Sequence, residues 1–295
     1  MTSAESQNSV TVVIPTFNRR ELLLRALASV YQQSLQPTQV IVVDDGSTDG
    51  TGMAVKNHYP QVEYLWQPNR GVSSARNSGI GIARHPWIAL LDNDDEWLPD
   101  KLETQFARLH RDPHLQVCHC EEIWIRNGRR VNQGKRHAKS EGDLFLECLP
   151  LCAMSPSSVL IHRTVFDQIG LFDEQLPACE DYDLWLRITA HFEVALVTEP
   201  QILKYGGHAD QLSRAFWGMD RFRIRALQRL LTAGGLRSDQ YRAALDMLAS
   251  KTKVYAAGAQ KRGRLDEVKK LNRILQRLTD TQPVGRLSSL PESRV

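Results

Sequence analysis

The chain has 295 residues, 42% of them hydrophobic, which is enough for one large domain, or one domain with an appendage, to bury a core without covalent staples. No apolar run approaches the roughly 18 residues of a membrane span. Residues 1–9 are polar, lack the apolar core of a signal peptide and are expected to be disordered, so we expect a cytoplasmic protein.

Five cysteines, an odd number without a paired Cys-x-x-Cys frame, argue against a secreted disulfide scaffold, and we expect them to be reduced. Cys118, His119 and Cys120 could suggest zinc. That interpretation is disfavoured because neighbours on an alternating strand point to opposite faces.

The net charge of +3 conceals an asymmetry. Residues 1–217 hold 20 Lys and Arg against 27 Asp and Glu, whereas residues 218–279 hold 15 against 5. The excess of ten positive charges suggests that residues 218–279 face a lipid surface, a phosphorylated acceptor or the acidic part of the chain itself. A solvated basic helix face is the alternative.

Strands and helices alternate over the first hundred residues. The expected strands are 10–15, 39–43, 62–67 and 86–91, and the expected helices are 21–33, 47–58 and 73–83. Nearly continuous apolar strands predict an α/β fold with a mostly parallel central sheet flanked by helices. Ligands of such sheets bind beyond the carboxyl ends of the strands.

The later elements are less regular. We expect a hairpin at Asn127-Gly128 within 117–131, strands at 157–162 and 194–197, helices at 98–110, 163–170 and 182–191, and three further helices at 218–233, 238–261 and 264–279. The predicted organisation is a domain over 10–217, with a first half at 10–100 and a second half at 101–217, a basic all-helical extension at 218–280 and a disordered tail at 281–295.

The segment Asp92-Asn93-Asp94-Asp95-Glu96 follows a buried strand and holds four acids in five residues. Adjacent carboxylates repel by about 1 kcal/mol per pair even in water, and a divalent cation would remove this cost. Mg²⁺ and Mn²⁺ take one or two carboxylates and complete their shell with substrate phosphates. The segment therefore predicts a metal–diphosphate site, with a calcium loop or an acidic helix N-terminus as alternatives.

Three other polar segments follow strands in the same half. They contain Thr16 to Arg19, Asp44 and Asp45, and Asn69 to Arg76. A carboxylate can accept the N–H of a uracil-type base, and guanidinium groups attract a diphosphate. Taken singly, each segment could equally be a helix cap or a surface charge.

In this order, five segments resemble the signature of the family 2 glycosyltransferases, which have the GT-A fold. They are VVIPTFNR, VVDDGSTDGT, NRGVSSARNSGI, LLDNDDEW with its DXD motif, and EDYDLWLRI. The resemblance covers roughly residues 10–215, and it implies that residues 10–100 form the nucleotide-binding half and residues 101–217 the acceptor half of one glycosyltransferase domain. It implies an inverting transfer of a sugar from a nucleotide-sugar, most simply a UDP-sugar, in bacterial surface glycan or glycolipid synthesis.

The resemblance also implies roles for individual residues. The nucleotide-binding candidates are Pro15, Thr16, Phe17, Arg19, Asp44, Asp45, Asn69, Gly71, Arg76, Asp92 and Asn93. Among these, Asp44 would bind the base and Asp92 would face the ribose. Asp94 and His208 would hold the metal, Mg²⁺ or Mn²⁺. Asn93 replaces a smaller residue of the usual motif, which leaves the metal role intact.

A second acidic cluster, Glu180-Asp181, begins a predicted helix, and both residues are catalytic candidates. The resemblance makes Asp181 the general base, and a carboxylate opposite the leaving diphosphate can take the proton of an acceptor hydroxyl. Acidic capping of the helix N-terminus is the alternative, and both can hold together.

Two other classes remain open. A nucleotidyltransferase is disfavoured because no Gly-rich phosphate loop follows the first strand, and a non-catalytic nucleotide- or carbohydrate-binding protein is disfavoured because Asp94 and Asp181 are both present. The expected partners are a nucleotide-sugar donor, a carbohydrate or lipid-linked acceptor and a peripheral membrane contact through 218–279, with no nucleic acid. The sequence leaves the oligomeric state open.

Overall fold

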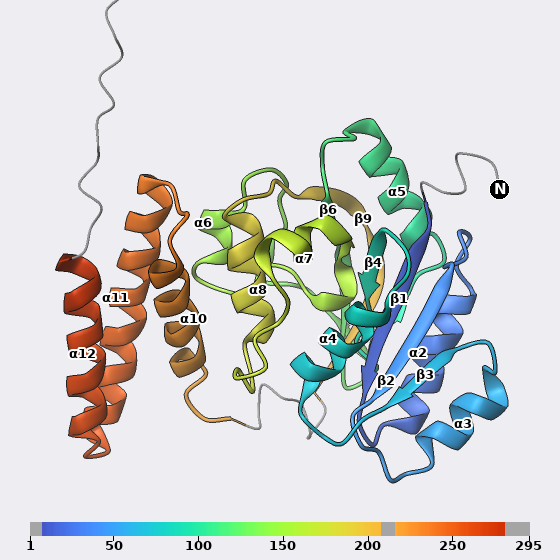
Figure 1. The fold of residues 1–295 in the computed structure, drawn as a ribbon, viewed down its shortest axis with the longest axis horizontal. Helices are drawn as coiled ribbons and strands as arrows, with labels where there is room; N and C mark the ends of the chain where they lie inside the picture. Colours follow the sequence, from blue (N-terminus) through green and yellow to red (C-terminus); the bar gives the residue numbers. More distant parts are fainter. Residues whose placement is uncertain (1–7, 208–215, 281–295) are drawn as a thin grey trace, which may run out of the picture. The chain divides into compact units, whose positions relative to one another are not determined.

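The computed structural model describes residues 8–207 and 216–280, which form two compact units, one up to Met219 and one from Asp220 (Figure 1). His208 and the predicted tail lie outside the described residues, as does most of the N-terminal segment. No helix within the described ranges combines the length and apolarity that crossing a membrane requires.

The first unit begins with strands and helices in strict alternation. These elements are β1 (Val10–Thr16), α2 (Arg20–Tyr31), β2 (Gln39–Asp44), α3 (Thr51–His58), β3 (Glu63–Trp66), α4 (Val72–Ile82) and β4 (Trp87–Leu90). The four strands are parallel, in the order β3-β2-β1-β4. The order reverses between β1 and β4, and at such a switch point the connections diverge and leave a crevice beyond the strands' carboxyl ends.

Both faces of this parallel sheet are covered, which explains why β1, β2 and β4 are apolar along most of their length. Val12 and Ile14 of β1 belong to a buried cluster that includes Leu27 of α2. Val13 points the other way, toward α4, which approaches so closely that a Cβ on Gly79 would lie 2.4 Å from Val13 Cγ1. Glycine at this position therefore lets the helix pack against the sheet.

The rest of the first unit extends the same sheet. It contains β5 (Glu96–Trp97), α5 (Lys101–Arg111), β6 (Val117–Arg126), β7 (Arg129–Val131), α6 (Phe145–Cys148), β8 (Leu160–His162), α7 (Arg163–Ile169), α8 (Glu180–Thr189) and β9 (Ala195–Gly206). Short 3₁₀ turns lie at Lys135–His137 and Pro156–Ser158. Because β8 pairs antiparallel to β4 and β6, whereas β9 runs parallel to β6, the complete sheet is mixed.

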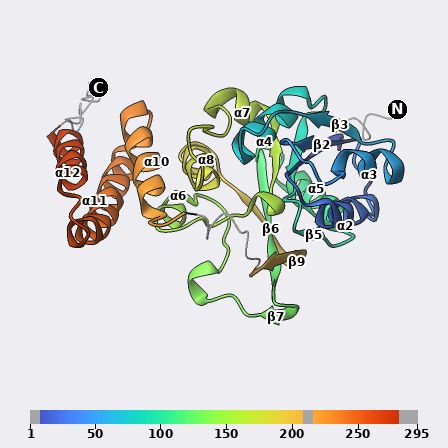
Figure 2. The ribbon, with the colours of Figure 1, turned by 90° about the horizontal axis from the view of Figure 1, so that it is seen from below.

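The hairpin predicted at Asn127-Gly128 is confirmed, with φ values of 50° and 72° at its two turn residues. Figure 2 shows β7 at the tip of this hairpin. Strand β9 is much longer than the expected 194–197. Its middle, Glu199-Pro200-Gln201, gives no apolar signal, and it pairs with β6 across a register shift at Glu121.

The second unit is helical, with α10 (Asp220–Ala233), α11 (Ser238–Lys261) and α12 (Leu265–Asp280). Helix α10 buries Leu227 and Leu230, and α11 buries Leu245 and Leu248. Helix α12 has the apolar period that its sequence predicts, but none of its residues is fully buried.

Candidate functional site

Hydrogen bonds tie together the loops that follow β1, β2 and β4. The backbone N–H of Asn18 donates to Ser47 Oγ at 2.8 Å, and Asn18 Oδ1 accepts from the backbone N–H of Thr48 at 2.7 Å. Asn18 has a φ of 50°, a conformation that asparagine tolerates well. On the other side, Asn93 Nδ2 donates to the carbonyl oxygen of Pro15 at 3.0 Å. The loops therefore form one polar edge at the β1–β4 switch point.

Asp44 ends β2 at this edge and is buried. Its Oδ1 atom accepts the backbone N–H of Ser47 at 2.7 Å, and the hydroxyl of Tyr64 donates to Oδ2. Burial and the bond to Asp44 raise the pKa of Tyr64, so this hydroxyl stays protonated. Each carboxylate oxygen can accept a second hydrogen bond, so Asp44 keeps acceptor capacity for a ligand N–H.

The neighbouring Asp45 organises the loop that follows β3. Its Oδ1 atom accepts from Gln67 Nε2 at 2.7 Å and from the backbone N–H of Arg70 at 2.9 Å, and its Oδ2 atom accepts from the backbone N–H of Gly71 at 2.7 Å. Asn69 packs closely on Gly46. A Cβ added to Gly46 would lie 3.0 Å from the backbone nitrogen of Asn69. Asp45 and Gly71 thus shape the edge of the site.

The acidic segment after β4 is held by arginines from α2 and its N-terminal flank. Arg19 Nη1 lies 3.0 Å from Asp94 Oδ2 and 3.2 Å from Asn93 Oδ1. Arg25 donates to the backbone carbonyl of Asp94 at 2.9 Å and pairs with Glu96 at 3.0 Å. The guanidinium of Arg19 therefore pairs with Asp94, the carboxylate that the sequence predicts as the metal ligand.

Asp95 turns away from the other acids into the interior. Its Oδ2 atom accepts the hydroxyl of Ser157 at 2.6 Å, and its Oδ1 atom accepts the backbone N–H of Tyr205 at 3.0 Å. Burial, and then the charge of Asp94, raise the pKa of Asp95 well above its usual value. Asp95 therefore joins the acidic turn to the 3₁₀ turn Pro156–Ser158 and to β9, leaving Asp92 and Asp94 at the edge.

A buried arginine connects the two acidic clusters. Arg76 on α4 is 3% exposed, with Nη2 2.7 Å from Asp92 Oδ1 and Nη1 2.8 Å from Glu180 Oε1. Burial opposes its charge, but the two carboxylates raise the pKa of Arg76, so it is a fixed cation. Burial and the neighbouring Asp181 raise the pKa of Glu180, while Arg76 opposes that rise. The resemblance implies that Arg76 lies near the nucleotide. In the structure, the guanidinium of Arg76 lies between the carboxylates of Asp92 and Glu180.

Asp181 occupies the first turn of α8, beside Glu180. Cys179, the residue immediately before the helix, has a φ of 60°. Asp181 Oδ1 accepts the backbone N–H of Tyr182 at 2.7 Å, and Cys152 Sγ lies 3.0 Å from Oδ2. The residue is partly exposed, unlike Glu180, so its carboxylate can reach a ligand.

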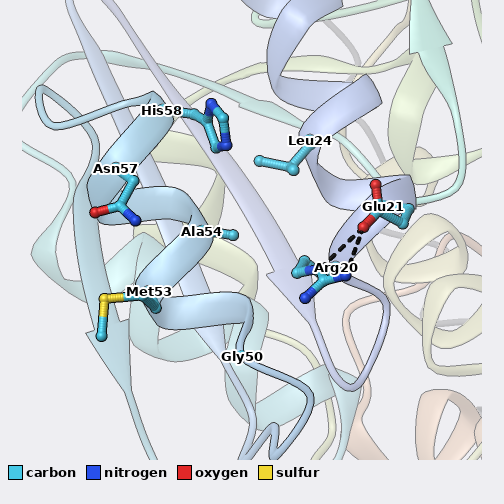
Figure 3. Close-up of a pocket in the computed structure, with 8 residues that line it drawn as sticks. All are labelled: Arg20, Glu21, Leu24, Gly50, Met53, Ala54, Asn57 and His58. Carbon is cyan, nitrogen blue, oxygen red and sulfur yellow. Dashed lines mark hydrogen bonds and ion pairs between the residues drawn. The ribbon is translucent and has the colours of Figure 1, made fainter.

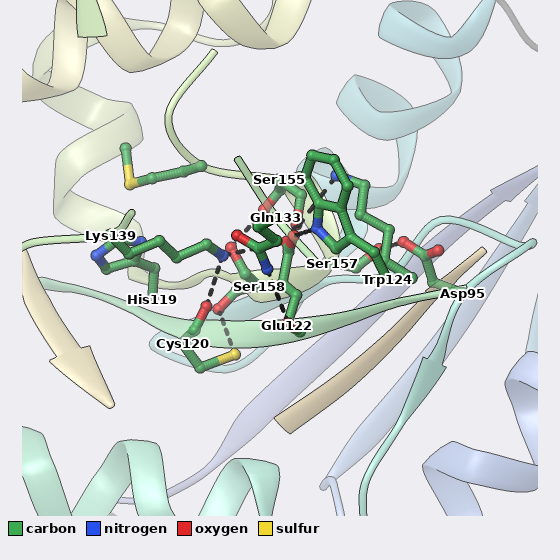
Figure 4. A network of polar contacts seen from close by, with 12 residues as sticks. Asp95, His119, Cys120, Glu122, Trp124, Gln133, Lys139, Ser155, Ser157 and Ser158 are labelled. Atoms are coloured by element: carbon green, nitrogen blue, oxygen red, sulfur yellow. Dashed lines mark hydrogen bonds and ion pairs between the residues drawn. The ribbon is translucent and has the colours of Figure 1, made fainter. Parts of the chain in front are cut away.

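A buried ionic network centred on Glu122 of β6 lies near Asp95 (Figure 4). Glu122 accepts from Ser155 Oγ, from Trp124 Nε1 at 2.9 Å and from Lys139 Nζ at 3.1 Å. Burial would raise the pKa of Glu122, but Lys204 and Lys139 lower it to about 2. The charge of Lys204 is stabilised by Glu122 first and by Asp95 next, so the network continues into the acidic turn.

The donor set fits a hard divalent cation that takes few protein ligands. Among residues 8–207 and 216–280, no three His, Cys, Asp or Glu side chains gather closely enough to form a complete metal site. Asp94 offers a carboxylate of the kind that Mg²⁺ or Mn²⁺ takes, and either ion, with one or two such ligands, would complete its shell with phosphate and water.

A pocket of about 460 Å³ lies elsewhere, between α2 and α3 (Figure 3). Its lining residues are Arg20, Glu21, Leu24, Gly50, Met53, Ala54, Asn57 and His58. None of them is among the predicted nucleotide or metal residues, so we locate the candidate site at the polar edge instead.

The side chains that the structure adds to the site, and that the sequence did not single out, include Arg25, Tyr64, Cys152, Ser157 and Glu122. Each of these side chains bonds to a residue distant in sequence, so no local sequence pattern could have predicted its place in the site. The zinc alternative finds little support, because His119 Nε2 bonds to the carbonyl of Ser140 at 2.8 Å, whereas Cys118 and Cys120 face the core.

Comparison with known proteins identifies the class. Residues 11–170 match the model of Glycosyl transferase family 2, more than half of the chain, so the chain belongs to this family. An uncharacterized glycosyltransferase of Rickettsia prowazekii is 31% identical over 183 residues, covering 60% of this chain and 58% of that protein. This chain thus spans less than two thirds of that relative. The putative colanic acid biosynthesis glycosyl transferase WcaA of Escherichia coli is 29% identical over 199 residues, covering 62% of this chain and 67% of WcaA.

Solved structures agree on the fold. A crystal structure of S. aureus TarS in complex with UDP-GlcNAc matches with a TM-score of 0.70 and 18% identity, covering 93% of this chain and 82% of that one. The predicted GT-A fold is thereby confirmed.

Proposed function

We propose that this protein transfers a sugar from a UDP-sugar to an acceptor hydroxyl by a single inverting displacement, in the synthesis of a bacterial glycan. The observation that carries the proposal is the bridge through Arg76, which holds Asp92 of the DXD segment and Glu180 beside Asp181 on one guanidinium. The groups needed at the donor and at the acceptor are thus held on one buried framework.

The donor would lie along the polar edge. Asp44 has acceptor capacity for the N–H of uracil, and Arg19 and Arg25 supply positive charge for the diphosphate. Mg²⁺ or Mn²⁺ at Asp94 would supply neutralisation of the leaving diphosphate's charge. The TarS structure bound to UDP-GlcNAc supports a UDP-sugar, as an analogy of fold.

The acceptor would approach Asp181. Its carboxylate takes the proton of the hydroxyl as the oxygen attacks the anomeric carbon, which contributes about 10²- to 10⁴-fold to the rate. Attack from the face opposite the diphosphate inverts that carbon in one step. WcaA, whose name assigns it to colanic acid biosynthesis, supports a carbohydrate acceptor.

We further propose that the basic second unit holds the enzyme against an anionic surface that carries the acceptor. Residues 218–279 carry ten more positive than negative charges. Each Lys or Arg near an anionic membrane contributes roughly 1 kcal/mol. Binding to phosphatidylserine vesicles should weaken as salt rises, and equal binding to neutral phosphatidylcholine vesicles would refute this surface.

The donor is tested by thermal unfolding with UDP, GDP, ADP, CDP and dTDP, each with and without Mn²⁺. UDP with Mn²⁺ should raise the transition temperature most, since a ligand at 100 times its dissociation constant stabilises by about 2.7 kcal/mol. Asp44→Asn should remove the preference for UDP, whereas Asp49→Asn, a turn aspartate bonded to Thr51, should keep it. A larger shift with another nucleotide would exclude UDP as the donor nucleotide.

A further inference from the structure

We propose that Cys152 is a positioning residue that holds the carboxylate of Asp181 in the orientation that accepts the acceptor's proton. The inference rests on the proposed function, because it takes Asp181 as the base. Cys152 lies in the segment between α6 and the turn Pro156–Ser158, far in sequence from α8.

The two oxygens of Asp181 are held from different directions. The backbone N–H of Tyr182 donates to Oδ1 at 2.7 Å, and the thiol of Cys152 lies 3.0 Å from Oδ2. Cys152 Sγ is also 3.2 Å from the carbonyl oxygen of Met154. The thiol has a single proton, and a charged carboxylate is the stronger acceptor. With both oxygens engaged, the carboxylate plane cannot rotate freely.

The protonation of Cys152 suits a donor rather than a nucleophile. Burial, followed by the charge of Asp181, raises the pKa of Cys152 well above its usual value. A thiol with a raised pKa is a poor nucleophile. The thiols of Cys118 and Cys120 donate to backbone carbonyls instead, so the carboxylate partner distinguishes Cys152 from these two.

Matched substitutions at Cys152 separate positioning from packing. Cys152→Val removes the donor at a somewhat larger volume, Cys152→Ser restores a donor, and Cys148→Val makes the same change of volume at a buried thiol on α6. The assay is UDP release from UDP-GlcNAc and other UDP-sugars, with water as acceptor. We expect Cys152→Val to lower kcat about tenfold without changing the donor KM. Cys152→Ser should recover most of kcat, and Cys148→Val should match the wild type.

The contact between Cys152 and Asp181 can also be tested without measuring turnover, through the chemical reactivity of the Cys152 thiol. The rate at which iodoacetamide alkylates Cys152, followed by mass spectrometry of its peptide, should rise in Asp181→Asn, because the neighbouring negative charge is gone. An unchanged or lower rate would overturn the contact between the two side chains.

The kinetic outcomes distinguish the two proposals. If Asp181→Asn is inactive while Cys152→Val turns over normally, the positioning role fails and the base stands. If Asp181→Asn remains active, the base itself fails. A Cys152→Val defect that Cys152→Ser does not repair would show a packing role and would also overturn the inference.

Discussion

Arg76 donates to Glu180 across a distance of 2.8 Å, inside the protein and at the meeting point of two segments far apart in sequence. The same guanidinium reaches Asp92 at 2.7 Å. Two of the acids that the sequence singles out therefore depend on one cation that is buried with them.

Arg76→Gln should leave both carboxylates without their counter-charge. Removing one partner from a buried ion pair typically costs about 3–5 kcal/mol, so the free energy of unfolding should fall by that order. All six tryptophans precede Asp220, so their fluorescence in urea reports the first unit. Arg84→Gln, which breaks an exposed pair with Glu63, should cost at most about 1 kcal/mol. Equal losses in the two variants would contradict the bridge.

Arg19→Ala should change metal and nucleotide binding in opposite directions. Removing the guanidinium from Asp94 frees a carboxylate for Mn²⁺, so binding of Mn²⁺ alone should tighten about threefold or more. UDP in the presence of Mn²⁺ should bind about tenfold more weakly, since a charge-assisted bond to phosphate is lost. Titration calorimetry measures both affinities.

Arg20→Ala, which removes an exposed pair with Glu21, is the control and should change neither affinity. If Arg19→Ala shifts both affinities in the same direction, Arg19 does not exchange between the metal ligand and the diphosphate.

Because His119 is buried, we expect the protein to lose stability in mild acid. Burial, with Lys139 nearby, lowers the pKa of His119 to about 3, while the unfolded chain takes up this proton near pH 6.5. Stability from this group is present above pH 6.5 and is lost as the pH falls toward 3. Between pH 7 and 5 the loss amounts to about 2 kcal/mol.

His119→Gln should remove that part of the pH dependence, as measured by urea unfolding at the two pH values. His114→Gln, an exposed histidine, should leave it unchanged. If the difference between pH 7 and 5 were the same in His119→Gln as in the wild type, His119 would not be the group that resists protonation.

The parallel half of the fold and its strand ends could be predicted because their signals are local. Apolar strands, helical periods and the Asn127-Gly128 turn depend on residues close in sequence, and β1, β2 and α11 match their expected ranges within a residue. Contacts such as Glu122 with Lys139, or Asp95 with Ser157, connect distant segments, and no periodicity encodes them. The inward turn of Asp95 likewise depends on β9, most of which the sequence did not reveal.

The most direct measurement is UDP release by Asp181→Asn, together with the affinity of the same variant for UDP and Mn²⁺. We predict turnover about 100- to 10,000-fold below the wild type, with nucleotide affinity within about threefold. Asp183→Asn removes a charge from the same helical turn, where Asp183 pairs with Arg187, and should retain turnover. Turnover by Asp181→Asn close to the wild-type rate would contradict the assignment of Asp181 as the base.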